Sequence, residues 1–130
     1  MLKIVEIHTS LRTSGEYVVL QNQGLHTVSL AGWALCTDTY LCGSAEEAST
    51  KMFVFHDDVP IKPYARVVLF TGRGQSGWCA TNDGKQAFVA YWGKDESVWR
   101  DATHVHLLQI AASKRVVLPD AEIEYMSAHT

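Results

Sequence analysis

The sequence has few of the features that tie a chain to a metal, a membrane or a disulfide framework. It contains three cysteines, Cys36, Cys42 and Cys79, and no Cys-x-x-Cys pair that would indicate a structural zinc. The sequence contains no run of about 18 apolar residues, so it predicts no membrane-spanning helix. The first residues lack the apolar core of a signal peptide, so we expect a cytoplasmic protein with free thiols. Pairing of Cys36 with Cys42 across a loop stays open.

The sequence also lacks a strong charge of one sign. Its 130 residues carry 11 lysines and arginines against 14 acidic residues, a formal net charge of −3. No overall field therefore draws the molecule to phosphate backbones or anionic lipid. With 47% hydrophobic residues and four tryptophans, the chain is long enough for one domain with a real core.

Little in the sequence indicates a helix. Short β-rich runs alternate with turn residues at a spacing of roughly 8–12 residues, which is typical of a β-sandwich or barrel with about eight or nine strands. The expected strands are 2–7, 16–22, 27–30, 33–36, 52–55, 65–71, 86–92, 105–110 and 114–118. We expect the sandwich to occupy residues 1–118 and the acidic tail, 119–130, to be partly disordered.

Two segments allow helical structure. Residues 97–114 lack glycine and proline, and their apolar side chains Trp99, Ala102, Val105 and Leu108 recur at helical spacing. A helix there is the alternative to the predicted strand. Within the loose segment 41–50 we expect at most a single helical turn, over residues 45–48.

One motif points toward a nucleotide. Gly72, Gly74 and Gly77 have the Gly-x-Gly-x-x-Gly spacing that cradles a pyrophosphate, and Asp95 follows at about the distance of a ribose-binding acid. Such a site needs its third glycine in the first turn of a helix. The residues after Gly77 leave no room for one before the next strand. We therefore interpret this stretch as a glycine-rich loop between strands.

A second pattern is more specific. The stretch GEYVVLQNQGLHTVSLAGWAL, residues 15–35, resembles the opening of the lamin tail domain, an immunoglobulin-like module. That pattern is Glu, aromatic, Val, x, aliphatic, x, Asn, a turn, then Val-x-Leu-x-Gly-Trp. The matching positions are Glu16, Tyr17, Val18, Leu20, Asn22, Val28, Leu30, Gly32 and Trp33. The resemblance implies an all-β, immunoglobulin-like sandwich with little or no helix.

The rest of the chain resembles the family less closely. An aromatic strand with Phe53 and Phe55, a proline-bearing turn and the run 67–69 follow the expected order, as does the later run WGKDESVWRDATHVHLLQ. Tyr64 stands where the family usually has glycine after proline, and residues 112–113 replace its usual acidic turn.

On such a sandwich, the aliphatic positions of the opening pattern would face between the two sheets. Gly32 would let the chain bend where Trp33 enters the core, and Asn22 would bond its own backbone and fix the turn after its strand.

Candidate catalytic and metal sites are few. His104 and His106 project from one strand face near Asp101, and 56–58 reads His-Asp-Asp, but solvent-facing side chains explain both sets better than a metal. Ser76 is not in a nucleophile elbow, because Trp78 occupies the last glycine position. Adjacent carboxylates, 46–47, 57–58 and 95–96, lie in turns. We expect no catalytic residue, metal or cofactor.

Contact with a partner is better supported. The 72–85 loop carries Arg73, Trp78 and Lys85, a combination typical of an interface hot spot, unless Trp78 folds back over the core. Exposed sheet edges offer a second route through strand addition. A third is a basic surface, for which the candidates are Arg66, Arg100, Lys114 and Arg115.

These features predict a non-catalytic interaction module that binds a protein partner, or a second copy of itself, through loops and sheet edges. The alternative is an accessory domain associated with nucleic acid. Its phosphate contacts would be Arg73, Lys85, Lys114 and Arg115, and its stacking residue Trp78 or Trp92. The net negative charge counts against this alternative.

Overall fold

The computed structural model of the chain describes residues 1–37, 51–82, 84–100, 102 and 104–109. These residues form ten β-strands and one turn of 3₁₀ helix, η1, with no α-helix among them. The strands are β1 (Leu2–His8), β2 (Tyr17–Asn22), β3 (Val28–Ser29), β4 (Trp33–Thr37), β5 (Met52–Val54), β6 (Pro60–Ile61), β7 (Arg66–Phe70), β8 (Gly77–Ala80), β9 (Gln86–Tyr91) and β10 (Val105–Gln109). η1 (Thr13–Gly15) lies between β1 and β2.

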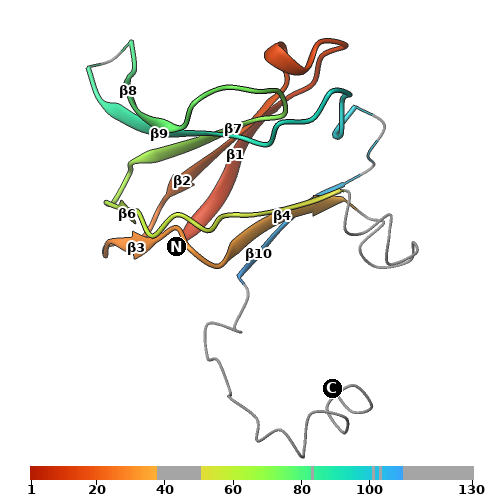
Figure 1. Ribbon diagram of the computed structural model, residues 1–130. Helices are drawn as coiled ribbons and strands as arrows, with labels where there is room; N and C mark the ends of the chain where they lie inside the picture. The colour runs from red at the N-terminus through yellow and green to blue at the C-terminus, as the bar shows by residue number, and fades with distance from the viewer. Residues whose placement is uncertain (38–50, 83, 101, 103, 110–130) are drawn as a thin grey trace, which may run out of the picture.

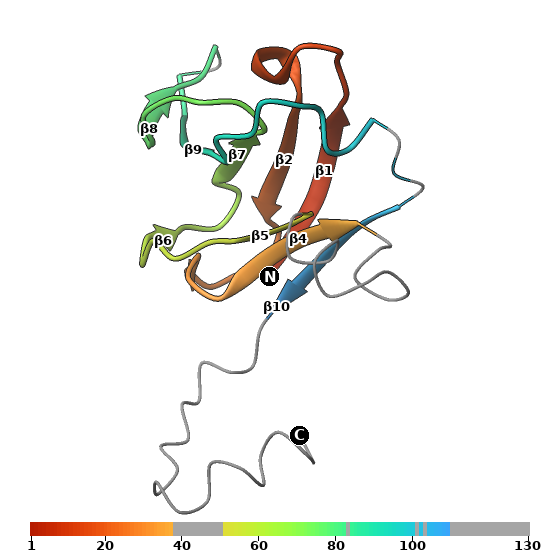
Figure 2. The same cartoon turned by 45° about the vertical axis from the view of Figure 1, so that its right-hand side comes forward.

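The strands form two layers (Figures 1 and 2). One layer is a five-stranded sheet in the order β1-β2-β7-β9-β8. The other combines the three-stranded sheet β10-β4-β5 with the short pair β3-β6. All pairings are antiparallel except that of β7 with β9. The predicted all-β sandwich is confirmed.

Two predicted elements cannot be compared with the structure, since residues 45–48 and 114–118 lie outside the described part of the chain. The helical alternative over residues 97–114 is wrong where that segment is described. Val105–Gln109 pair antiparallel with β4 as strand β10 instead. Pairing along β4 satisfies the backbone of this stretch, so the helical spacing of its apolar side chains does not decide the outcome.

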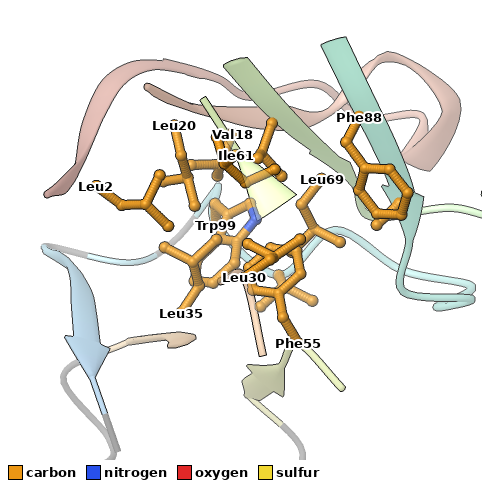
Figure 3. Close-up of a cluster of buried hydrophobic side chains, with 13 residues drawn as sticks. Leu2, Val18, Leu20, Leu30, Leu35, Phe55, Ile61, Leu69, Phe88 and Trp99 are labelled. Atoms are coloured by element: carbon orange, nitrogen blue, oxygen red, sulfur yellow. The ribbon is translucent and has the colours of Figure 1, made fainter. Parts of the chain in front are cut away.

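The core lies between the layers and is built from alternating strand residues. Val18 and Leu20 of β2 are fully buried, as are Val67 and Leu69 of the neighbouring β7. The opposite layer and its connections contribute Leu30, Leu35, Phe55 and Ile61 to the same cluster. Figure 3 shows Trp99 among these side chains. The predicted inward positions Val18, Leu20 and Leu30 are confirmed, and Val28 packs against the cluster while partly buried.

The prediction that Trp33 enters the core is only partly right. Trp33 is partly buried and packs against the cluster, whereas Trp99 is 2% exposed and belongs to it. The reason is the turn before β4. Trp33 N donates to Leu30 O at 3.2 Å, and Gly32 has φ +91, which side-chain-bearing residues rarely adopt. Trp33 is the first residue of β4, and full burial begins with the next residue, Ala34.

Asn22 fixes the end of β2, as predicted. Its Oδ1 accepts a hydrogen bond from Gly24 N at 3.0 Å, which holds the turn. Its Nδ2 donates to His26 O and to Ile61 O, both at 2.8 Å. Because Ile61 lies in β6, this fully buried amide joins the five-stranded sheet to the opposite layer.

A buried carboxylate forms a second tie between distant segments. Glu16 precedes β2 and is 0% exposed. Its Oε1 accepts hydrogen bonds from Thr71 Oγ1 at 2.7 Å, Val98 N at 2.9 Å and Trp99 N at 3.3 Å. Its Oε2 accepts one from Ser97 Oγ. Burial raises the pKa of this carboxyl, but the four hydrogen bonds outweigh it, and the pKa is lowered from 4.5.

Candidate partner-binding groove

The 72–85 segment is not only a loop. Its residues Gly77–Ala80 form β8, which pairs antiparallel with β9 and ends the five-stranded sheet. Trp78 lies directly opposite Phe88, and the two rings meet edge to face at 5.6 Å. This cross-strand aromatic pair helps to explain why a glycine-rich stretch forms a strand.

Glycine in this segment allows side chains of other elements to pack closely against the backbone. Directly opposed residues His8, Tyr17, Phe70 and Tyr91 form a ladder of stacked or tilted rings across β1, β2, β7 and β9. The chain passes so close to this ladder that a Cβ at Gly74 would collide with the Tyr91 ring.

The other two glycines differ from each other. A Cβ at Gly72 would lie 2.9 Å from Thr13 Oγ1, whereas nothing lies within 4 Å of one at Gly77. Gly77 begins a strand and not a helix. Close contacts inside the fold thus account for Gly72 and Gly74, and the helix that a pyrophosphate loop needs after the third glycine is replaced by strand β8.

The three predicted partner-binding residues separate into two places. Arg73 forms an ion pair with Asp95 at 2.7 Å, with both side chains mostly exposed. Trp78 and Lys85 lie together at the β8–β9 hairpin, where both line one groove. Trp78 contacts Phe88 but does not fold away over the core, because it remains 44% exposed.

The groove has a volume of about 640 Å³ and separates the β8–β9 hairpin from the β6–β7 turn. We call it the basic groove. It is lined by Gln21, Pro60, Lys62, Pro63, Tyr64, Ala65, Arg66, Trp78, Thr81, Lys85 and Gln86. Among the described residues, three that line the groove are basic and none is acidic. In both ribbon views β6 and β8 lie on the same side of the molecule (Figures 1 and 2).

Tyr64 occupies an unusual backbone position beside this groove. Ala65 N donates to Lys62 O at 3.0 Å, closing a β-turn with Pro63 and Tyr64 at its centre. Tyr64 has φ +67, the left-handed conformation for which glycine is preferred after proline. Its backbone is held on both sides, since Tyr64 N donates to Asn22 O at 2.6 Å and Tyr64 O accepts from Gln21 Nε2 at 3.3 Å. The phenol ring is nevertheless 59% exposed.

The sequence reasoning missed part of this site. Lys62 was not singled out, and Tyr64 was noted only as a departure from the family pattern. That departure was the available signal, because a bulky residue at a glycine position of a Pro-Gly turn predicts strain. Of the proposed basic surface, Arg66 lines the groove and Arg100 does not, while residues 114 and 115 lie outside the described part of the chain.

The two outer strands of the five-stranded sheet differ. β1 has a register shift between Ile4 and Glu6, an irregularity of the kind that protects sheet edges. β8 pairs with β9 in continuous register. Thr81 N donates to Lys85 O, so these two residues form a hydrogen-bonded pair. Hydrogen-bonded and non-hydrogen-bonded pairs alternate along an antiparallel ladder. The backbone N–H and C=O groups of Trp78 and Ala80 therefore point away from β9.

The metal candidates gain no support from the geometry. The rings of His104 and His106 lie 6.2 Å apart, and Asp101 falls outside the described residues. Asp58 accepts a hydrogen bond from Ser29 Oγ at 2.6 Å, and His56 is exposed. Within the part of the chain that is described, no group of three His, Cys, Asp or Glu side chains is arranged to hold a metal.

The two described thiols lie in different environments. Cys36 is buried in β4, and Cys79 is exposed on β8. Cys42 is not among the described residues, so the alternative that it pairs with Cys36 stays open.

Comparison with known proteins decides the family. The model of one protein family, Lamin Tail Domain, matches residues 1–130. The chain belongs to the lamin tail domain family. The immunoglobulin-like sandwich that the resemblance implied is thereby confirmed, in a family that is non-catalytic and often interacts with proteins. No curated protein matches the chain. In the described ranges of this lamin tail domain, no helix is long and apolar enough to cross a membrane.

Proposed function

We propose that this lamin tail domain is a non-catalytic module that holds a protein partner at the β8 edge and in the adjoining basic groove. The observation that carries the proposal is Trp78, a large aromatic side chain that is 44% exposed on the last strand of a sheet. Buried aromatic anchors dominate the binding energy of protein interfaces. A second exposed ring, Tyr64, lies in the same groove lining.

Of the three predicted partner-binding residues, we propose that two belong to the binding site. Trp78 and Lys85 belong to the proposed binding face, since both line the basic groove. Arg73 is outside that lining and already neutralised by Asp95. We therefore propose that Arg73 contributes little to partner binding. We also propose that the domain needs no cofactor.

A pull-down from the native source tests this function. The full chain is used as bait in three forms: wild type, Trp78→Ala and Leu25→Ala. Leu25 is 82% exposed and lies outside the groove lining, which makes it a matched loss of surface apolar area. We expect proteins retained by wild type and Leu25→Ala to be lost with Trp78→Ala. A hot-spot aromatic contributes at least about 2 kcal/mol, which corresponds to about 30-fold in affinity.

One control and one contrary outcome complete the design. Melting curves of the three proteins establish that each bait is folded. If Trp78→Ala retains the same proteins in the same amounts as wild type, the proposed binding face is wrong.

The nucleic-acid alternative keeps only part of its predicted site. Trp92 is packed against Phe53 and Trp99, with ring centroids 5.7 and 5.4 Å away, and Lys94 Nζ lies 5.3 Å from its ring centroid. This arrangement disfavours Trp92 as a stacking platform. Trp78 and Lys85 remain as candidates. Binding of labelled single-stranded DNA that weakens steeply with salt would favour the alternative.

A further inference from the structure

We infer that the basic groove and the β8 edge together bind an extended acidic segment of a partner protein. This inference rests on the proposed function and adds the chemistry of the partner. The segment would pair with β8 as an additional strand, place an apolar side chain beside Trp78 and Tyr64, and direct carboxylates toward the basic side chains of the groove.

The β8 edge supplies the backbone interaction. The N–H and C=O groups of Trp78 and Ala80 point away from β9, since Thr81, Cys79 and Gly77 are the residues whose backbone groups face it. They form a template for a partner strand, as in other complexes formed by strand addition. The opposite edge of the sheet offers a poorer template because β1 is irregular between Ile4 and Glu6.

The positive charge of the groove favours a partner segment with negative charge. Lys62, Arg66 and Lys85 come from the β6–β7 turn, the start of β7 and the β8–β9 turn, and all three are exposed. None of the described residues that line the groove is acidic, although the whole chain carries a net charge of −3. A local basic surface on an acidic molecule favours an acidic ligand by electrostatic complementarity.

Tyr64 supplies a rigid apolar contact. A left-handed conformation is uncommon for a residue with a bulky side chain, and such strain is found preferentially at ligand-binding sites. Three hydrogen bonds hold the backbone of this turn: Ala65 N donates to Lys62 O, Tyr64 N donates to Asn22 O, and Tyr64 O accepts one from the Gln21 side chain. The ring is thus exposed on a fixed backbone, where it loses little backbone entropy on binding.

The same features argue against other occupants. A second copy paired edge to edge through β8 would bring two sets of basic side chains together, which is unfavourable. Single-stranded nucleic acid would suit the charge and the two rings, but it does not use the strand-pairing groups of Trp78 and Ala80. An acidic strand uses the charge, the rings and the sheet edge.

Fluorescence anisotropy with labelled peptides tests the inference. The first probe is a peptide of about nine residues, with Val-Phe-Val at its centre and glutamates on both sides, long enough to span the four-residue strand β8. The second replaces the glutamates with lysines. The third keeps the glutamates but is N-methylated at alternate residues, which blocks strand pairing. A labelled oligothymidine is the fourth. Each is titrated with wild type, Lys85→Glu and Trp78→Ala.

We expect the acidic probe to bind wild type at least about tenfold more tightly than the lysine and N-methylated probes. Lys85→Glu and Trp78→Ala should each weaken the acidic probe by about tenfold or more. Arg12→Glu is the matched charge control, because Arg12 is exposed before η1 and lies outside the groove lining. It should change the affinity by less than about twofold.

Contrary outcomes separate the two proposals. Equal binding of the acidic and lysine probes, or of the acidic and N-methylated probes, would overturn the acidic-strand inference. So would binding of oligothymidine without binding of the acidic peptide, which would assign the groove to nucleic acid. If the pull-down depends on Trp78 while the acidic probe does not bind, the proposed function stands and the partner chemistry is wrong. If the pull-down is independent of Trp78, the proposed function itself fails.

Discussion

Replacing Glu16 with glutamine removes one negative charge from the interior and keeps the size and shape of the side chain. Glu16 is 0% exposed, and its carboxylate accepts hydrogen bonds from Thr71, Ser97, Val98 and Trp99. The last three belong to the connection that carries the largest core side chain, Trp99. The substitution therefore weakens the attachment of this connection to the start of β2.

The size of the effect can be worked from the four hydrogen bonds. A hydrogen bond to a charged group contributes about 1.5–3 kcal/mol, against about 0.5–1.5 kcal/mol for a neutral one. Four bonds weakened by about 1 kcal/mol each would cost about 4 kcal/mol. The lower cost of burying a neutral amide offsets part of this loss. We expect the free energy of unfolding at pH 7 to fall by about 2–3 kcal/mol, and the melting temperature by roughly 6–15 °C.

The charge also makes the effect depend on pH. The folded-state pKa of Glu16 is lowered from 4.5, so its carboxylate binds protons less readily in the folded state than in the unfolded state. Its stabilisation is therefore fully present above about pH 5 and is lost as the pH falls through the folded-state pKa. Glutamine does not titrate. The difference in stability between wild type and Glu16→Gln should stay constant from pH 7 to about pH 5 and shrink below pH 4.5.

Urea unfolding followed by tryptophan fluorescence measures this difference at each pH. Glu6→Gln is the matched control, because Glu6 is an exposed carboxylate that accepts one hydrogen bond from Tyr17 Oη at 2.9 Å. It should change the stability by no more than about 0.5 kcal/mol. The reasoning is refuted if Glu16→Gln unfolds like Glu6→Gln at pH 7, or if its deficit is the same at pH 7 and pH 4.

Five further substitutions, grouped in three tests, probe the fold. Gly74→Ala should lower the free energy of unfolding by about 1–3 kcal/mol, because its Cβ collides with the Tyr91 ring, whereas Gly77→Ala should stay within about 1 kcal/mol of wild type. Trp99→Ala should cost about 3–5 kcal/mol and Trp33→Ala clearly less; equal losses in urea unfolding would contradict this ranking. Tyr64→Gly should leave the melting temperature equal or higher, since glycine relieves the left-handed backbone, and a marked drop would show that the ring itself stabilises the fold.

Much of the fold could be predicted from local patterns. The alternation around Glu16–Asn22 and the Gly32–Trp33 turn have consequences within a few residues, so the strands and the buried face of β2 follow from them. The burial of Trp33 could not be predicted in the same way. Whether a residue at the start of a strand lies inside or at the rim depends on the partner layer. Here the centre is filled by Trp99, a residue of the segment for which a helix was the alternative prediction.

The candidate site likewise depends on contacts that local sequence patterns do not predict. Trp78 and Lys85 were predicted from their composition and nearness in sequence, and both line the basic groove. Lys62 and Tyr64 belong to another connection, and only the pairing of β7 with β9 brings their turn near the β8–β9 hairpin. Arg73 is close to Trp78 in sequence, but it pairs with Asp95 and lies outside the groove lining. Sequence distance is a poor guide where the contacts are long-range.

Three departures from ordinary local rules coincide at the basic groove. A tyrosine adopts a glycine conformation, a tryptophan stays 44% exposed, and the outermost strand β8 lacks the register shift that interrupts β1 at the opposite edge of the sheet. Each departure is unfavourable or hazardous for an isolated domain. The buried ties at Glu16 and Asn22 have their hydrogen-bonding groups satisfied. Local exceptions that gather at one surface are expected where a sequence is selected for binding. This distribution, more than any single side chain, is why we assign the partner to β8 and the groove beside it.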